Sequence, residues 1–128
     1  MTDLKSRLGE AVTAAFAAEG VASDKIRVTA SDRPDLADFQ SNAAMAVAKA
    51  HGTNPRDLAG RVAARLEGHA DLTSVEVAGP GFINLVVSPA SLASRAAEIL
   101  GDEARRGAEP VEQARRVIID YAGPNVAK

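Results

Sequence analysis

The sequence contains no cysteine, which excludes both a disulfide framework and a thiolate metal site. Aromatic residues make up only 3% of the 128 residues, so Ala, Leu, Val and Ile must build the core. No apolar run is long enough to span a bilayer, and the N-terminus lacks the basic segment and apolar block of a signal peptide. We therefore expect a cytoplasmic protein with no membrane partner.

An excess of basic charge is also absent. The chain has 15 Lys and Arg against 17 Asp and Glu, and its formal net charge is −2. This balance argues against a domain that holds nucleic acid by its global charge, so RNA contact would need a local patch and few phosphates. Such binding would be weak and salt-sensitive. His51 and His69 stand alone, so no metal site is predicted.

Apolar spacing and turn residues predict an α+β fold. Leu4, Leu8, Val12 and Phe16 recur every four residues, which is typical of a helix with one buried face. We expect an antiparallel sheet of three or four strands, with about four helices packed mainly on one face. The predicted order is helix 4–19, strand 26–30, a helix from 39–41 to 50, helix 55–66, strand 73–78, strand 82–87 and helix 89–101.

The chain is predicted to divide into three segments. Residues 1–101 form the N-terminal domain, and the charged, aperiodic segment 102–116 is a linker. Residues 117–128 begin with Val-Ile-Ile, an apolar run typical of a strand buried in a parallel sheet. Such a strand has no later partner here, so we expect a fragment whose second domain is missing. The unpaired strand would seek the hairpin sheet or a second copy of the chain.

Three segments carry a resemblance to the arginyl-tRNA synthetases. Residues 38–42 (Asp-Phe-Gln-Ser-Asn) are similar to the family's lead-in to its second helix, although Ala37 stands where glycine is usual. Residues 79–84 (Gly-Pro-Gly-Phe-Ile-Asn) are similar to its hairpin turn. Residues 119–128 are the most specific match, and in the family this run leads into a His-x-Gly-His signature, which is absent from this sequence.

The resemblance implies an N-terminal appended domain ahead of a Rossmann-like catalytic domain. Its partners would be arginine tRNA, contacted at the D-loop and elbow, and the missing catalytic domain of the same chain. The parent enzyme would join arginine to its tRNA using ATP and magnesium. The fragment alone would be inactive and would hold no cofactor. The alternative is a structural module that packs on the catalytic body without recognising RNA.

The candidate tRNA-binding residues lie at the predicted hairpin. Strand alternation places Phe82 and Asn84 on one face, where an aromatic ring can stack on a loop base and an amide can bond its edge. By resemblance these two residues and Gly79 contact the tRNA, with Asn84 standing where some members carry Gln. The plainer alternative makes Phe82 a core residue and Asn84 a polar residue beside the turn.

Other charged and polar positions have roles that the resemblance implies or that the sequence leaves open. Asp120, Gly123 and Asn125 would lie at the arginine pocket of the parent enzyme, and Lys128 near the ATP phosphates. On the third helix, Arg56, Arg61 and Arg65 could touch tRNA phosphates, but a solvated helix face is the favoured interpretation.

Overall fold

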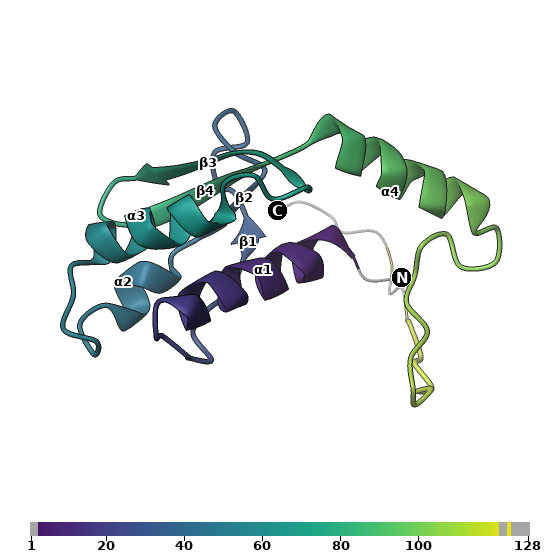
Figure 1. Ribbon diagram of the computed structural model, residues 1–128. Helices are drawn as coiled ribbons and strands as arrows, with labels where there is room; N and C mark the ends of the chain where they lie inside the picture. The colour runs from purple at the N-terminus through teal and green to yellow at the C-terminus, as the bar shows by residue number, and fades with distance from the viewer. Residues whose placement is uncertain (1–2, 121–122, 124–128) are drawn as a thin grey trace.

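The computed structural model describes residues 3–120 and 123 and has an α+β architecture (Figure 1). Four strands form one antiparallel sheet, as predicted, and their order in the sheet is β1-β2-β4-β3. The described chain contains these elements in order: α1 (Leu4–Ala18), β1 (Thr29–Ala30), β2 (Phe39–Ser41), α2 (Ala43–Val47), α3 (Pro55–Leu66), β3 (Leu72–Ala78), β4 (Phe82–Val87) and α4 (Pro89–Gly101).

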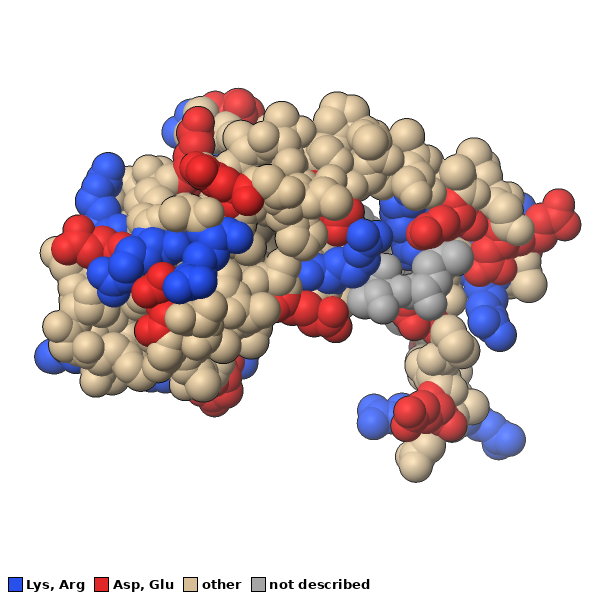
Figure 2. Space-filling view, in the orientation of Figure 1, with Lys and Arg blue, Asp and Glu red and all other residues tan. Residues whose placement is uncertain are grey.

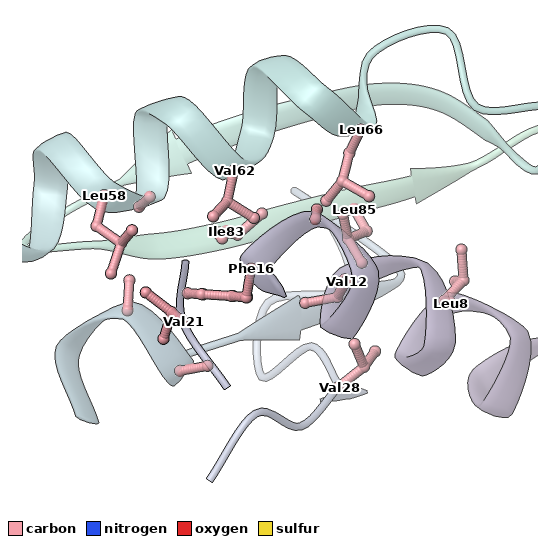
Figure 3. Close-up of a cluster of buried hydrophobic side chains, with 14 of the residues drawn as sticks. Leu8, Val12, Phe16, Val21, Val28, Leu58, Val62, Leu66, Ile83 and Leu85 are labelled. Atoms are coloured by element: carbon pink, nitrogen blue, oxygen red, sulfur yellow. The ribbon is translucent and has the colours of Figure 1, made fainter. Parts of the chain in front are cut away.

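Three of the helices cover one face of the sheet. Helices α1, α2 and α3 lie together beneath the strands, and α3 contacts both β3 and β4 (Figure 1). Phe16 of α1 is completely buried among aliphatic side chains from the helices and from β4 (Figure 3). The core is therefore built mainly from Ala, Leu, Val and Ile, as the scarcity of aromatics requires.

Local signals in the sequence fix the starts of α3 and α4. Asn54 and Ser88 each precede a proline at the first helical position. The Asn54 Oδ1 atom accepts from the Arg56 backbone N–H at 2.9 Å, and the Ser88 Oγ atom accepts from the Ser91 N–H at 3.2 Å. Both side chains cap their helices, because these oxygens satisfy amide groups that have no partner inside the helix.

The hairpin of β3 and β4 agrees with the prediction. Ala78 pairs with Phe82 next to the turn, and the ladder continues to Leu72 opposite Val87. Along β4 every second side chain, beginning with Ile83, is buried against the helices. The intervening side chains, including Asn84, consequently lie on the opposite face of the sheet.

The start of the second helix was predicted wrongly. Residues 39–41 do not begin a helix but form strand β2, which pairs Phe39 with Leu85 and Ser41 with Ile83. The helix that follows, α2, spans only Ala43–Val47. The apolar residues after position 42 have helical spacing, but the pairing partner of the preceding segment lies more than 40 residues away in the sequence. Tertiary pairing thus overrides the local pattern.

Helix α4 and the segment after it differ from the expected packing. Helix α4 extends beyond the sheet, and none of its residues is buried (Figure 1). Residues 117–119 form no strand and are 69–89% exposed. The predicted strand is absent here because a continuous apolar run needs cover on both faces, which the described part of the chain does not supply. The predicted linker, the domain boundaries and the self-association stay predictions.

Candidate nucleic-acid interface

The sheet face opposite the helices carries the two residues predicted to contact RNA. Phe82 and Asn84 lie on this face because their neighbours Ile83 and Leu85 point into the core on the other side. Both side chains are half-buried. The register places Gln40 of β2 directly across from Asn84. Opposed residues of an antiparallel pair point to the same face. The structure therefore brings together an aromatic ring and two side-chain amides.

A hollow of about 240 Å³ lies over this part of the sheet. Strand residues supply one side of it, and the loop between β1 and β2 supplies the other. Its volume is below the roughly 300–1,000 Å³ of sites for drug-sized ligands, which suits a single planar ring system. The lining residues are Ser31, Asp32, Arg33, Leu36, Gln40, Ala78, Phe82 and Asn84.

The loop that borders the hollow is held by its own hydrogen bonds. The Ser31 backbone N–H donates to the Asp38 carbonyl at 3.1 Å, and the Ser31 Oγ atom accepts from the Arg33 N–H at 3.1 Å. The Leu36 N–H donates to the Arg33 carbonyl at 2.9 Å. This turn leaves the Leu36 side chain 55% exposed at the edge of the hollow.

Arg33 is the one Lys or Arg among the lining residues, and its charge is already paired. Its Nε and Nη2 atoms donate to the Asp35 carboxylate at 3.0 and 2.8 Å. These hydrogen bonds raise the pKa of Arg33 and lower the pKa of Asp35 from their ordinary values. Asp32 also lines the hollow. Its carboxylate only accepts hydrogen bonds, so this edge of the hollow is poorly suited to a phosphate.

The turn between β3 and β4 presents Phe82. Gly79 and Gly81 have φ angles of +53° and +146°, which L side chains rarely adopt. A Cβ atom at Gly81 would lie 3.1 Å from the Pro55 carbonyl group, so the turn packs directly on the start of α3. The Arg56 Nη1 atom donates to the Gly79 carbonyl oxygen. Gly79 therefore supports the turn through its backbone carbonyl, and it does not line the hollow.

The arginines of α3 gather outside the hollow. Figure 2 shows basic side chains over α3, with acidic groups beside them. Arg61 and Arg65 donate to the Glu19 carboxylate at 3.2 and 2.8 Å. Hydrogen bonding from Arg65, together with both positive charges, lowers the pKa of Glu19 from its ordinary value. This arrangement agrees with the favoured interpretation of a solvated helix face.

Of the residues predicted for the arginine and ATP sites, the structure describes only two, and these lie apart from the hollow. Asp120 and Gly123 are exposed, and neither lines the hollow. Asn125 and Lys128 lie outside the described residues. Within residues 3–120 and 123, no group of three or more His, Asp or Glu side chains is placed to hold a metal ion. No helix in this part of the chain is long and apolar enough to cross a membrane.

Sequence reasoning missed the loop residues 31–36 and the contribution of Gln40. The predicted order gives the segment between residues 30 and 39 no role, and it places Gln40 at the start of a helix. The signal that unites them is the pairing of β2 with β4, which places Gln40 beside Asn84. A pairing over such a sequence distance leaves no periodic trace in either segment.

Comparisons with known proteins point to one family. Residues 2–87 match the family model described as the arginyl-tRNA synthetase N-terminal domain. The chain is 54% identical over 128 residues to an arginine–tRNA ligase of Hyphomonas neptunium, covering all of this chain and 22% of that protein. It is 42% identical over 127 residues to an arginine–tRNA ligase of Cellvibrio japonicus, covering 98% of this chain and 22% of that protein.

A solved structure supports the same fold. The Thermus thermophilus arginyl-tRNA synthetase superposes with a TM-score of 0.63 at 21% identity, covering 84% of this chain and 17% of the other. At 21% identity this similarity supports the fold alone. The chain spans about a fifth of the length of the curated relatives that it matches.

Proposed function

The chain belongs to the family of arginyl-tRNA synthetase N-terminal domains, and from this premise we propose that it positions arginine tRNA by contacting the D-loop at the tRNA elbow. The observation that carries the proposal is the hollow beside Phe82 and Asn84. It offers an aromatic surface and amide groups on an exposed sheet face, the combination that binds an unstacked loop base.

Stacking supplies most of the affinity in this proposal. A base stacked on an aromatic side chain contributes about 1–3 kcal/mol. The hollow has no unpaired cation among its lining residues, because Arg33 is bonded to Asp35. With a net charge of −2 the chain gains little from phosphates. The contact therefore orients the tRNA, and the larger protein holds it.

The proposal extends to the whole protein. The parent enzyme attaches arginine to its tRNA in the cytoplasm using ATP and magnesium. Asp120 supplies negative charge for the arginine side chain, Gly123 close backbone approach, and Asn125 a polar contact. Lys128 places a cation near the ATP phosphates, where charge develops during the reaction. This chain alone is proposed to be inactive, since these residues need the remainder of the protein to form a site.

A structural role is the second candidate, and one observation favours it. Leu92 and Leu100 of α4 are 51% and 76% exposed, and residues 117–119 are exposed as well. Exposed apolar side chains of this size favour packing against a further body of protein. Under this hypothesis the domain braces the catalytic body and RNA contact is incidental.

A titration separates the two candidates. The chain is titrated with arginine tRNA and with a variant tRNA altered in the D-loop, at low and moderate salt. We expect the unaltered tRNA to bind more tightly. Phe82→Ala should abolish that preference and weaken binding by roughly 5- to 150-fold, the equivalent of one lost stack. Val86→Ala is the matched control, because Val86 shares the face of β4 with Phe82 but does not line the hollow.

The outcomes of this titration are distinct. If both tRNAs bind equally and Phe82→Ala binds like the unaltered protein, the D-loop proposal is wrong and the structural role is favoured. If Val86→Ala weakens binding as much as Phe82→Ala, the effect comes from the sheet face generally and the hollow is not the site.

A further inference from the structure

Helix α4 joins the body of the domain, residues 3–87, through polar contacts at its first turn. None of its residues is buried, and it makes no extensive contact with any other helix or strand of the described chain. Figure 1 shows it extending away from the sheet as an arm. Apolar packing normally holds a helix in place, so polar contacts must fix the direction of this one.

Two serines of the first turn bond to Asp71, the residue before β3. The Ser88 N–H donates to the Asp71 carbonyl at 2.8 Å. Three residues later, the Ser91 Oγ atom donates to the Asp71 Oδ1 atom at 2.7 Å. Ser88 follows β4 directly, so it is a single point about which α4 can rotate. Ser91 supplies a second point, and two points fix the direction of a helix.

Arg7 of α1 holds the Asp71 carboxylate in the orientation that meets Ser91. Its Nη2 atom lies 2.9 Å from Oδ1 and 2.8 Å from Oδ2 of Asp71. The Asp71 side chain is only 4% exposed, so the arginine compensates a charge that has little access to water. The Oδ1 atom therefore lies between a guanidinium of α1 and a hydroxyl of α4, and it connects the body of the domain to the arm.

The length of α4 makes its direction matter for the residues that follow. The helix has 13 residues and is about 20 Å long. A rotation of about 15° at Ser88 would move its far end by about 5 Å. The Arg95 Nη2 atom donates to the Gly107 carbonyl at 3.1 Å, so the start of the next segment is attached to the helix and would move with it.

We propose that Arg7, Asp71 and Ser91 form a latch that holds α4 in one direction, and that the helix rotates about Ser88 when the Ser91 hydroxyl leaves the carboxylate. This conformational device is separate from the proposed RNA contact and does not depend on it. A hydrogen bond to a charged group changes an equilibrium by roughly 10- to 150-fold. Its loss should raise the ratio of open to closed molecules by that factor.

Arg95 is the competing explanation for the direction of α4. Hydrogen bonds from Ser6 are the main cause of the lowered pKa of Asp3, and the positive charge of Arg95 contributes as well. Arg95 thus attracts the start of α1, although its printed partners are Glu98 and Gly107. An attraction without a hydrogen bond sets no fixed geometry. We therefore assign the direction of the helix to the latch and include Arg95→Met in the test.

Distances between pairs of spin labels measure the direction of α4. The chain has no cysteine, so labels attach only where cysteines are introduced. Ala46→Cys on α2 with Ala97→Cys on α4 reports the arm, because Figure 1 shows these helices at opposite ends of the molecule. Ala46→Cys with Lys5→Cys on α1 reports the body. All three positions are exposed. Pulsed electron paramagnetic resonance should give one narrow distance for each pair.

Ser91→Ala is the decisive variant. It removes the hydroxyl but keeps the backbone N–H that Ser88 caps, so α4 stays helical while the latch opens. The distance to α4 should broaden, and the distance within the body should not change. Ser91→Thr keeps a hydroxyl and should restore the narrow distance. Ser94→Ala is the matched control, because Ser94 is exposed three residues further along α4 and should leave both distances unchanged.

Arg7→Met opens the latch from the other side and should also broaden the distance to α4. If this variant disturbs the distance within the body as well, Ser91→Ala decides, because it leaves the pair of Arg7 and Asp71 in place. The latch is refuted if Ser91→Ala keeps the narrow distance, or if Ser94→Ala broadens it equally.

Two further results would overturn the proposal. A broad distance to α4 in the unaltered chain would show that nothing fixes the arm. Broadening in Arg95→Met without broadening in Ser91→Ala would assign the direction to the attraction between Arg95 and Asp3. Neither result affects the proposed function, because none of these residues lines the hollow beside Phe82.

Discussion

Arg7 of α1 forms an ion pair with Asp71, whose side chain is only 4% exposed, and the Arg7 Nη2 and Asp71 Oδ2 atoms lie 2.8 Å apart. The Asp71 Oδ1 atom also accepts from the Ser91 Oγ atom of α4 at 2.7 Å. The Asp71 carbonyl accepts from the Ser88 N–H at 2.8 Å. A single residue before β3 thus joins α1 to the start of α4, a helix that has no buried residue of its own.

Asp71→Asn is expected to lower the free energy of unfolding by about 1–3 kcal/mol, because hydrogen bonds to a charged group are lost at a buried position. Chemical denaturation with urea measures the change. Asp35→Asn is the matched control: its ion pair with Arg33 has the same 2.8 Å separation but is more than half exposed. It should change the free energy of unfolding by less than about 1 kcal/mol. Equal losses in both variants would contradict the role of burial.

Gly81→Ala is expected to destabilise the protein by about 1–3 kcal/mol, since a φ of +146° is strained for any residue with a Cβ atom. The new Cβ would also lie 3.1 Å from the Pro55 carbonyl group. Thermal unfolding measures the loss. Gly60→Ala in α3 is the control, because it has open space around it and ordinary helical geometry. It should stabilise the protein by about 0.5–1 kcal/mol. A neutral Gly81→Ala would show that the turn can rearrange.

The hairpin and its surroundings also show which structural features can be predicted from the sequence alone. Features set by neighbours in the chain were predictable: the Asn54 and Ser88 caps, the hairpin, and the alternation that places Phe82 and Asn84 on one face of β4. Features set by distant partners were not. The assignment of β2 depends on Leu85 and Ile83, and the hollow exists only because β2 places the loop 31–36 beside β4. Local pattern carries no information about either pairing.

The apolar spacing of α4 is a different case. Leu92 and Ile99 follow the period of a helix with one buried side, and the helix forms as predicted. Its apolar side nevertheless stays unburied in the described chain, as does the run at 117–119. Periodicity identified the helix and its apolar side correctly. It could not identify what covers that side, because burial depends on a surface elsewhere in three dimensions.

Glu19 should make stability depend on pH. Its pKa in the folded protein lies below the ordinary value, chiefly through the hydrogen bond from Arg65 and then through both neighbouring charges. The folded state therefore binds fewer protons than the unfolded chain in mildly acidic solution. The stabilisation is complete above the unfolded pKa and disappears as pH falls through the folded pKa.

Glu19→Gln should accordingly flatten the decline in stability between about pH 6 and about pH 3. Urea unfolding across that range measures the slope. Arg65→Met should flatten it in the same way, because it removes the main cause of the lowered pKa. Glu10→Gln is the control, since Glu10 lies within α1, the helix that Glu19 ends, and is paired with neither Arg61 nor Arg65. An unchanged slope in both Glu19→Gln and Arg65→Met would refute the assignment.

Arg56 connects the stability of the turn to RNA binding. Its Nη1 atom donates to the Gly79 carbonyl oxygen, and Gly79 lies beside the Phe82 ring, to which an added Cβ would come within 3.6 Å. Loss of this hydrogen bond should loosen the turn that presents the ring. We expect Arg56→Met to weaken binding of arginine tRNA by roughly two- to tenfold, the equivalent of one hydrogen bond.

Salt dependence distinguishes this positioning role from a direct phosphate contact. An arginine that neutralises a phosphate contributes about 0.7–0.9 to the slope of log K against log salt concentration, because it releases a counterion. A residue that only positions the turn contributes nothing to that slope. Arg56→Met should therefore lower the affinity equally at low and moderate salt. Arg65→Met on the same helix should leave the affinity for the tRNA unchanged, since Arg65 is bonded to Glu19 and lies outside the hollow. A reduced slope in Arg56→Met would instead make Arg56 a phosphate ligand and extend the RNA contact from the sheet face to the start of α3.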